Sequence, residues 1–168
     1  MELPNGLQFS LRGKVAAVTG GVAGSVSPLL RRSLAQVPMS PLLNVSNKNA
    51  HEVAKQICDA ISAIVSDFGS LDIMVANAGI AASGKTEDFD PEEFKRVHEV
   101  NVNGVLYTMQ AAANSIITMS SAVAHVVTRP QLPAAYCSSK AAASMLTRCV
   151  ATEWANQGVR VNANCQAT

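Results

Sequence analysis

The sequence predicts an α/β fold, a doubly wound parallel sheet flanked by helices, and three observations lead to this class. Short runs of β-branched and apolar residues alternate along the chain with longer stretches of helical periodicity. Several of the short runs stop at Gly or Asn, which is typical of buried parallel strands that enter a loop. No internal repeat, linker or low-complexity segment divides the 168 residues, so we expect a single domain over residues 1–168.

The first predicted strand covers residues 14–19 and stops at Gly20. A helix over Ser25–Gln36 is expected to follow, with Pro28 in its first turn, where a missing backbone N–H does no harm. The next strand is expected over residues 41–45. It is the weakest element of the prediction, because Pro41 removes a backbone donor that a central strand uses.

The rest of the chain continues the alternation of helices and strands. In chain order we expect a helix over 51–68, a strand over 71–76, a helix from Pro91 to about Ala113 with a kink near 101–104, a strand over 115–119, a helix over 134–156 and a strand over 159–162. Gly69 is placed to end the first of these helices at the C′ position. Asp90 is placed as the N-cap of the second.

Composition excludes several classes of protein. With 48% hydrophobic and 15% charged residues, the chain has ample material for a core and is not typical of a disordered protein. A formal net charge of +1 gives no strong field to attract nucleic acid or an anionic membrane. The longest uncharged stretch, residues 100–128, is interrupted by polar side chains, so we expect no membrane span. The first residues lack the apolar segment of a secretion signal, and a cytoplasmic location is expected.

The cysteines carry no recognisable pattern. There are four of them, Cys58, Cys137, Cys149 and Cys165, and none forms a C-x-x-C pair. Their unrelated spacings indicate neither a zinc site nor a disulfide framework. We therefore expect free thiols and no metal.

Two motifs in this framework can carry chemistry. Residues 19–24 lie between a strand and a helix, where backbone amides and the helix dipole can bind a pyrophosphate, although an ordinary glycine turn would look the same. Tyr136 and Lys140 are four residues apart, hence one turn apart on one face of a helix. An ammonium beside a phenol favours the phenolate, so Tyr136 can act as a general acid or base. The alternative is a surface tyrosine that happens to precede a lysine.

The combination of these motifs with the segments VANAG, NVNGV, YCSSKAA and WANQGVRVNA resembles the short-chain dehydrogenase/reductase family. The resemblance extends from about Leu11 to Ala163 and is greatest for fungal NADP-dependent polyol and sugar reductases of the mannitol dehydrogenase type. It implies a Rossmann-like fold and an NADP(H)-dependent oxidoreductase. The implied substrate is a small ketone, sugar or polyol-derived carbonyl, or the alcohol in the reverse direction.

The resemblance also implies roles for individual residues. Tyr136 would protonate the carbonyl oxygen, and Lys140 would lower the pKa of the tyrosine and hold the nicotinamide ribose. Asn101 would support a water relay behind the lysine, with a helix-kink residue as the alternative. The residues implied to bind the cofactor are Gly20, Gly24, Asn44, Asn77, Ala78, Gly79, Tyr136 and Lys140.

The chain departs from the family pattern at three positions. Val26 stands where the last glycine of the turn is expected, and its side chain obstructs the close approach of helix and cofactor. Asn44 stands where relatives that select NAD carry an acidic residue, so NADP is favoured over NAD. The family's catalytic serine would fall on Val123. Either a bulge brings Ser121 to the substrate, which we favour, or the hydroxyl is absent.

The chain is also shorter than the family pattern. Roughly twenty residues, including one strand, are expected to be missing between Asn44 and Asn77, so that the helix over 51–68 would be a fusion of two. The substrate-covering lobe that follows residue 163 in relatives is expected to be missing as well. The alternative to an active enzyme is therefore a catalytically silent product. It would bind a dinucleotide or associate with other subunits through the helix Ala134–Asn156, which is also the expected contact of a homo-oligomer.

Overall fold

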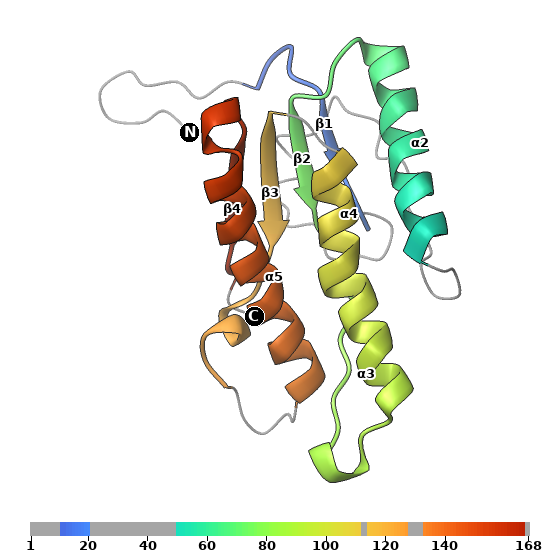
Figure 1. Cartoon of the computed structure of the whole chain (residues 1–168), viewed down its shortest axis with the longest axis vertical. Coiled ribbons are helices and arrows are strands. Elements are labelled where there is room, and N and C mark those ends of the chain that lie inside the picture. The colour runs from blue at the N-terminus through green and yellow to red at the C-terminus, as the bar shows by residue number, and fades with distance from the viewer. Residues whose placement is uncertain (1–10, 21–49, 112–113, 128–132, 167–168) are drawn as a thin grey trace.

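Four parallel strands form the centre of the structure, a computed structural model that describes residues 11–20, 50–111, 114–127 and 133–166. The strands are β1 (Ala16–Val18), β2 (Ile73–Ala76), β3 (Ser115–Met119) and β4 (Arg160–Asn164). They lie in the order β1-β2-β3-β4, and every neighbouring pair is parallel. Their carboxyl ends therefore meet at one edge of the sheet (Figure 1).

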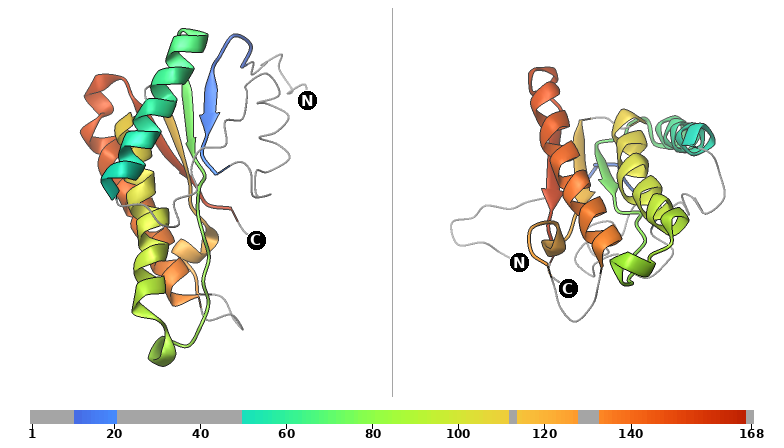
Figure 2. Two further views of the ribbon diagram at one scale, coloured as in Figure 1. Left: turned by 90° about the vertical axis from the view of Figure 1, so that its right-hand side faces the viewer. Right: turned by 60° about the horizontal axis from the view of Figure 1, so that its bottom comes forward.

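Four α-helices accompany these strands in the described residues. They are α2 (Ala50–Phe68), α3 (Pro91–His98), α4 (Gly104–Ala111) and α5 (Ala134–Glu153). Figures 1 and 2 show α2, α4 and α5 on the same face of the sheet, with α3 continuing α4 past the carboxyl edge. The predicted helix Ser25–Gln36 and the predicted strand over 41–45 lie outside the described residues, as do Gly24 and Asn44.

Side chains alternate across the sheet and divide the core into two layers. Met74, Ile116 and Val161 point to the helical face, where they pack with apolar residues of α2, α4 and α5. Val18 and Val75 point to the opposite face and form a smaller cluster. The two strands β1 and β2 are entirely apolar, as expected for strands covered on both faces, whereas β4 has one buried residue, Val161.

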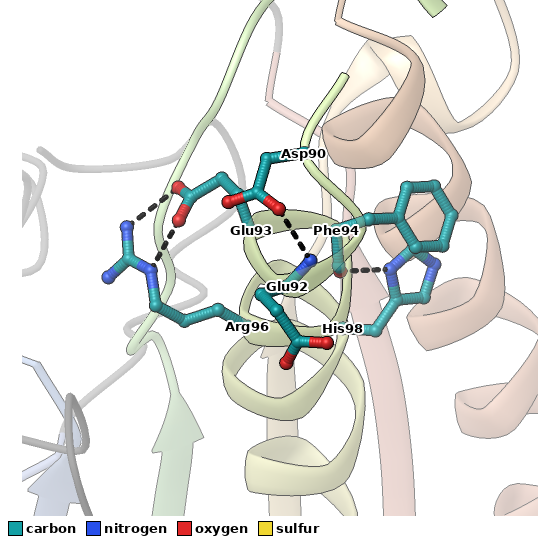
Figure 3. A network of polar contacts seen from close by, with 6 residues as sticks. All are labelled: Asp90, Glu92, Glu93, Phe94, Arg96 and His98. Carbon is teal, nitrogen blue, oxygen red and sulfur yellow. Dashed lines mark hydrogen bonds and ion pairs between the residues drawn. The ribbon is translucent and has the colours of Figure 1, made fainter. Parts of the chain in front are cut away.

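The start of α3 follows the predicted capping pattern (Figure 3). The Asp90 carboxylate accepts a hydrogen bond of 3.0 Å from the backbone N–H of Glu92, so the predicted N-cap is confirmed. One turn later Arg96 forms a bidentate pair with Glu93 at 2.7 Å. These exposed contacts stabilise the first turns of a short helix that has one fully buried side chain, Val97.

The kink predicted near residues 101–104 coincides with a π-helical turn. Residues Glu99–Asn103 form it between α3 and α4, and the backbone N–H of Gly104 bonds to the carbonyl of Glu99, five residues earlier. The extra residue in this turn rotates the following side chains relative to a regular helix. Val100 and Asn101 are buried there as a result.

Two boundaries differ from the prediction for reasons of tertiary contact. The last strand was expected to end at residue 162, but β4 continues to Asn164 because it pairs in register with β3 as far as Met119. The last helix ends at Glu153 and is followed by a 3-10 turn, Ala155–Gln157, before Gly158 with φ of 75°. The predicted helix over 51–68 and its glycine stop are confirmed by α2 and by Gly69, with φ of 79°.

Within the described ranges, no helix is long and apolar enough to cross a membrane. All four cysteines are free thiols. No group of three or more His, Cys, Asp or Glu side chains in the described part of the chain is arranged to hold a metal ion.

The core makes a first prediction about stability. Met74 is fully buried in the middle of the sheet, whereas Met145 on α5 is 55% exposed. We expect Met74→Ala to lower the free energy of unfolding by about 2–5 kcal/mol, because it removes apolar contacts and leaves a cavity. The matched control Met145→Ala should change it by less than about 0.5 kcal/mol. Urea denaturation followed by circular dichroism measures both, and equal losses in the two variants would contradict the described core.

Candidate active site

A cavity of about 270 Å³ lies at the carboxyl edge of the sheet, where loops leave β2, β3 and β4 and α5 begins. Parallel α/β sheets hold their ligands at this edge, because the strand ends present backbone and side-chain groups without covering them. The polar side chains that line the cavity are those of Asn77, Ser120, Ser121, Tyr136, Lys140 and Gln166. We refer to this cavity as the cleft.

The ends of β1 and β2 are held together beneath the cleft by Thr19 and Asn77. The Thr19 hydroxyl oxygen accepts hydrogen bonds of 3.1 Å from the backbone N–H groups of Asn77 and Ala78. In return, the Asn77 amide donates to the carbonyl of Thr19 at 3.0 Å. Gly20 has φ of 72°, and a Cβ there would lie 2.6 Å from the Cα of Ala78. The glycine therefore permits the two loops to touch.

The predicted cofactor-binding residues separate into two groups in the structure. Asn77 and Gly79 line the cleft, as predicted for residues that contact a ligand. Gly20 and Ala78 do not line it; they pack against each other behind it. Gly24 and Asn44 lie outside the described residues.

Asn101 is completely buried and joins three segments of the chain. Its side-chain oxygen accepts from the backbone N–H of Ile80 at 2.9 Å, and its side-chain nitrogen donates to the Ile80 carbonyl and to the Ser139 hydroxyl, each at 2.9 Å. The π-helical turn directs this side chain inward. Asn101 does not itself line the cleft but fixes the loop after β2 against α5.

Gly79 lies between Asn101 and the cleft lysine. A Cβ on this glycine would be 3.2 Å from the side-chain oxygen of Asn101 and 3.5 Å from the Lys140 ammonium nitrogen. Any larger side chain would displace one of the two. Gly79 is therefore needed because a side chain at this position would push against Asn101 or Lys140. Without one, the Lys140 ammonium faces the cleft.

The Lys140 side chain is buried, and its ammonium donates a hydrogen bond of 2.7 Å to the carbonyl of Met119 at the end of β3. Burial lowers the pKa of Lys140, because removal from water disfavours the charged form. The ammonium nitrogen lies 5.6 Å from the centre of the Tyr136 ring. The predicted placement of both residues on one face of a helix, at one site, is what the structure shows.

Tyr136 keeps its proton in this arrangement. Burial raises the pKa of its phenol, the Ser121 hydroxyl acts against this as a hydrogen-bond partner, and Cys137 adds a smaller rise. The net direction of the Tyr136 pKa is thus upward, although the resemblance implied a lowering by Lys140. The ammonium of Lys140 is directed to the Met119 carbonyl, and the loss of hydration of the phenolate is the largest cause of the rise.

Ser121 reaches the cleft, which was the favoured alternative for this position. It lies directly after β3 and begins a 3-10 turn, Ala122–Ala124, in which its hydroxyl oxygen accepts from the backbone N–H of Val123 at 3.4 Å. This turn, where we had expected a bulge, places Ser121 beside Tyr136. The neighbouring Ser120 has a supporting role, since its hydroxyl contacts the Ser144 hydroxyl on α5 at 2.6 Å.

Sequence analysis did not single out two residues, Ser139 and Gln166, that the structure brings to this region. Ser139 and Thr19, the first residue of the 19–24 motif, support the site from below through the hydrogen bonds described above, and Gln166 lines the cleft beyond the end of β4. The predicted strand ended at residue 162, four residues before Gln166, so the prediction did not place Gln166 at a strand end, where ligand-binding residues gather. Ser139 carried no signal beyond its place between Tyr136 and Lys140.

Comparison with known proteins shows which family the chain resembles. A protein-family model described as enoyl-(acyl carrier protein) reductase, one of the short-chain dehydrogenases/reductases, matches residues 45–167. The match covers the whole segment from α2 to β4 that builds the cleft. Members of this family bind a nicotinamide dinucleotide.

Individual relatives extend the match to nearly the whole chain. Sorbose reductase SOU1 of Candida albicans is 31% identical over 185 residues, with 92% of this chain and 66% of that protein covered. A probable NADP-dependent mannitol dehydrogenase of Yarrowia lipolytica is 32% identical, with 88% of this chain and 64% of that protein covered. The chain thus spans about two thirds of the length of these relatives. The alignment with SOU1 exceeds the 168 residues of the chain, so this chain is shorter within the matched region.

Among solved structures, the NADPH-dependent 3-quinuclidinone reductase of Rhodotorula rubra superimposes with a TM-score of 0.75 at 28% identity. The match covers 97% of this chain and 73% of that one. The two proteins therefore share one fold over almost the whole length of this chain. With the cleft residues in place, a family model over most of the sequence and a matching fold, the chain belongs to the short-chain dehydrogenase/reductase family.

Proposed function

We propose that this chain is an NADP(H)-dependent oxidoreductase that reduces the carbonyl of a small ketone, sugar or polyol-derived substrate and oxidises the alcohol in reverse. The observation that carries the proposal is the meeting of Tyr136, Ser121 and Lys140 at one cleft. These groups come from α5 and from the end of β3, and they supply a proton donor, a second hydroxyl and a positive charge.

The described residues fit the nicotinamide-ribose end of a dinucleotide. Gly79 keeps the wall of the cleft free of a side chain next to Lys140, and the ammonium of Lys140 has further N–H groups beyond the one bonded to Met119. A ribose hydroxyl is a suitable acceptor for them. We therefore assign Asn77, Gly79 and Lys140 to cofactor binding, with the phenol of Tyr136 beside them.

The chemistry divides between the cofactor and the protein. When bound, the nicotinamide supplies or accepts the hydride at the carbonyl carbon. The neutral phenol of Tyr136 donates its proton to the carbonyl oxygen, and Ser121 holds that oxygen by a second hydrogen bond. The charge of Lys140, 5.6 Å from the ring centre, favours the phenolate that remains. A proton from solvent then restores the phenol.

The choice of NADP over NAD and the sugar or polyol substrate are each supported by a separate observation. Asn44, which lies outside the described residues, offers no carboxylate to repel the 2′-phosphate of NADP, and relatives named for NADP or NADPH are among the matches. The sugar or polyol substrate follows the names of sorbose reductase and mannitol dehydrogenase. A cytoplasmic location and a homo-oligomer through the helix Ala134–Asn156 stay predictions from the sequence.

Cofactor binding can be tested without turnover. A ligand at about a hundred times its dissociation constant stabilises the folded chain by about 2.7 kcal/mol. We expect the thermal melting temperature of the 168-residue chain to rise with NADPH and to rise less with NADH at the same concentration. A cooperative transition indifferent to both cofactors would mean that the chain is a catalytically silent relative.

The proton donor is tested by Tyr136→Phe. General acid catalysis contributes about 10²–10⁴-fold, so we expect kcat/KM for ketose reduction by NADPH to fall by at least about 100-fold. The melting shift with NADPH should persist in this variant. Tyr107→Phe is the matched control, because Tyr107 is the other tyrosine of the chain and does not line the cleft. Equal activity of Tyr136→Phe and the unaltered chain would refute the mechanism.

The protonation of Tyr136 gives a pH prediction. Its pKa is raised by burial, so phenolate absorbance at 295 nm from this residue should appear above the ordinary tyrosine value of about 10. Ser121→Ala removes the hydrogen bond that lowers the pKa and should move the midpoint still higher. Because the unfolded chain ionises first, folding stability should fall as pH rises from about 10 to the folded value. Subtracting the absorbance titration of Tyr136→Phe from that of the unaltered chain isolates the contribution of Tyr136. A midpoint below pH 10 would contradict the raised pKa.

A further inference from the structure

The polar groups of the cleft are not all available to a substrate. The Lys140 ammonium bonds to the Met119 carbonyl, and the Asn77 amide nitrogen bonds to the Thr19 carbonyl. The Ser120 hydroxyl is taken up on α5, by Ser144 and by a backbone carbonyl at 3.3 Å. These side chains are held by the protein itself. The further N–H groups of Lys140 are assigned above to the cofactor, so these side chains leave little hydrogen-bonding capacity for a substrate.

Gln166 differs from these residues. Its backbone is fixed, because its carbonyl accepts a hydrogen bond of 3.0 Å from the N–H of Ala122, the residue after Ser121. Two residues earlier, the Asn164 carbonyl accepts from the N–H of Ser120 at 2.9 Å. The end of β4 is thus anchored beside the end of β3. Gln166 is one of the residues that line the cleft, it is exposed, and its side-chain amide has no hydrogen-bond partner among the described residues.

We propose that the amide of Gln166 binds a hydroxyl of the substrate adjacent to the reacting carbonyl, so that the cleft selects α-hydroxy ketones, and vicinal diols in the reverse direction. This inference rests on the proposed function. Tyr136 and Ser121 bind the carbonyl oxygen, which leaves Gln166 to bind a second oxygen. An amide offers both a donor and an acceptor, and a hydroxyl group uses both.

The size of the cleft supports a short distance between these two oxygens. The cleft has a volume of about 270 Å³, below the roughly 300–1,000 Å³ that is usual for ligand pockets, and the nicotinamide end of the cofactor would share it with the substrate. A small molecule that contacts Tyr136 therefore also lies near Gln166. Because Gln166 is tied to Ala122 through its backbone, replacing the side chain leaves the anchor of β4 intact.

The test compares two substrates that differ by one hydroxyl, hydroxyacetone and acetone. In Gln166→Leu, kcat/KM for hydroxyacetone with NADPH should fall about five- to tenfold more than kcat/KM for acetone, the size expected of one hydrogen bond between neutral groups. The control Gln157→Leu replaces an exposed glutamine far from the cleft lining and should not change the ratio of the two values. An unchanged ratio in Gln166→Leu would overturn the inference and leave the proposed function standing.

A binding measurement without cofactor separates the two claims. The products 1,2-propanediol and 2-propanol are titrated into the ¹⁵N-labelled chain, and the shift of the Gln166 side-chain amide signals is followed by NMR. We expect the diol to shift these signals and the mono-alcohol to leave them nearly in place. If neither ketone is reduced but the diol still shifts the amide, the proposed function fails and the hydroxyl site stands. If the diol shifts nothing, the inference is wrong.

Discussion

The buried side chain of Asn101 is the interaction on which the rest of the site depends. Its amide bonds to both backbone groups of Ile80 and to the hydroxyl of Ser139, with no exposure to water. Removing such a group leaves buried donors and acceptors unpaired, which costs about 1–3 kcal/mol for each. Ser139 in turn donates to the carbonyl of Tyr136 at 2.8 Å. One side chain thus sets the loop after β2 against the part of α5 that carries the reacting groups.

The helix α5 is organised around polar burial, which is unusual for a helix packed on a sheet. Ser139, Lys140, Ser144 and Thr147 are all buried, and each finds a partner on its own helix or at the end of β3. Such a face is stable only when every group is satisfied, because the interior strengthens hydrogen bonds and penalises missing ones alike. The same low polarity raises the pKa of the Tyr136 phenol and lowers that of the Lys140 ammonium. Burial therefore shifts the pKa values of the two groups in opposite directions and brings them closer together before any ligand enters.

The cleft is built from a contiguous part of the sheet. Its residues lie at the carboxyl ends of β2, β3 and β4, which are neighbours in the order β1-β2-β3-β4. The helices between these strands are present and cover one face. The chain is shorter than its relatives within the matched region, yet in the described residues α3 and α4 lie between β2 and β3, and α5 lies between β3 and β4. A sheet assembled from parallel units can lose length in one crossover without changing the registers of the others, since each pair of strands is held by its own ladder.

Local sequence determined the elements of this protein and the pairing of residues within one helix. Short apolar runs specified the strands. Asp90 marked the start of a helix through a hydrogen bond within its first turn, and Gly69 marked the end of another through its positive φ. The four-residue spacing of Tyr136 and Lys140 placed both on one face of α5. Tertiary structure alone decided that Ser121 reaches the cleft and that Gln166 joins it, because both positions depend on how β3 and β4 pair and where the chain then turns. It also decided the direction of the Tyr136 pKa. Burial shifts the pKa and results from contacts between segments that are far apart in the chain, so local sequence does not predict it.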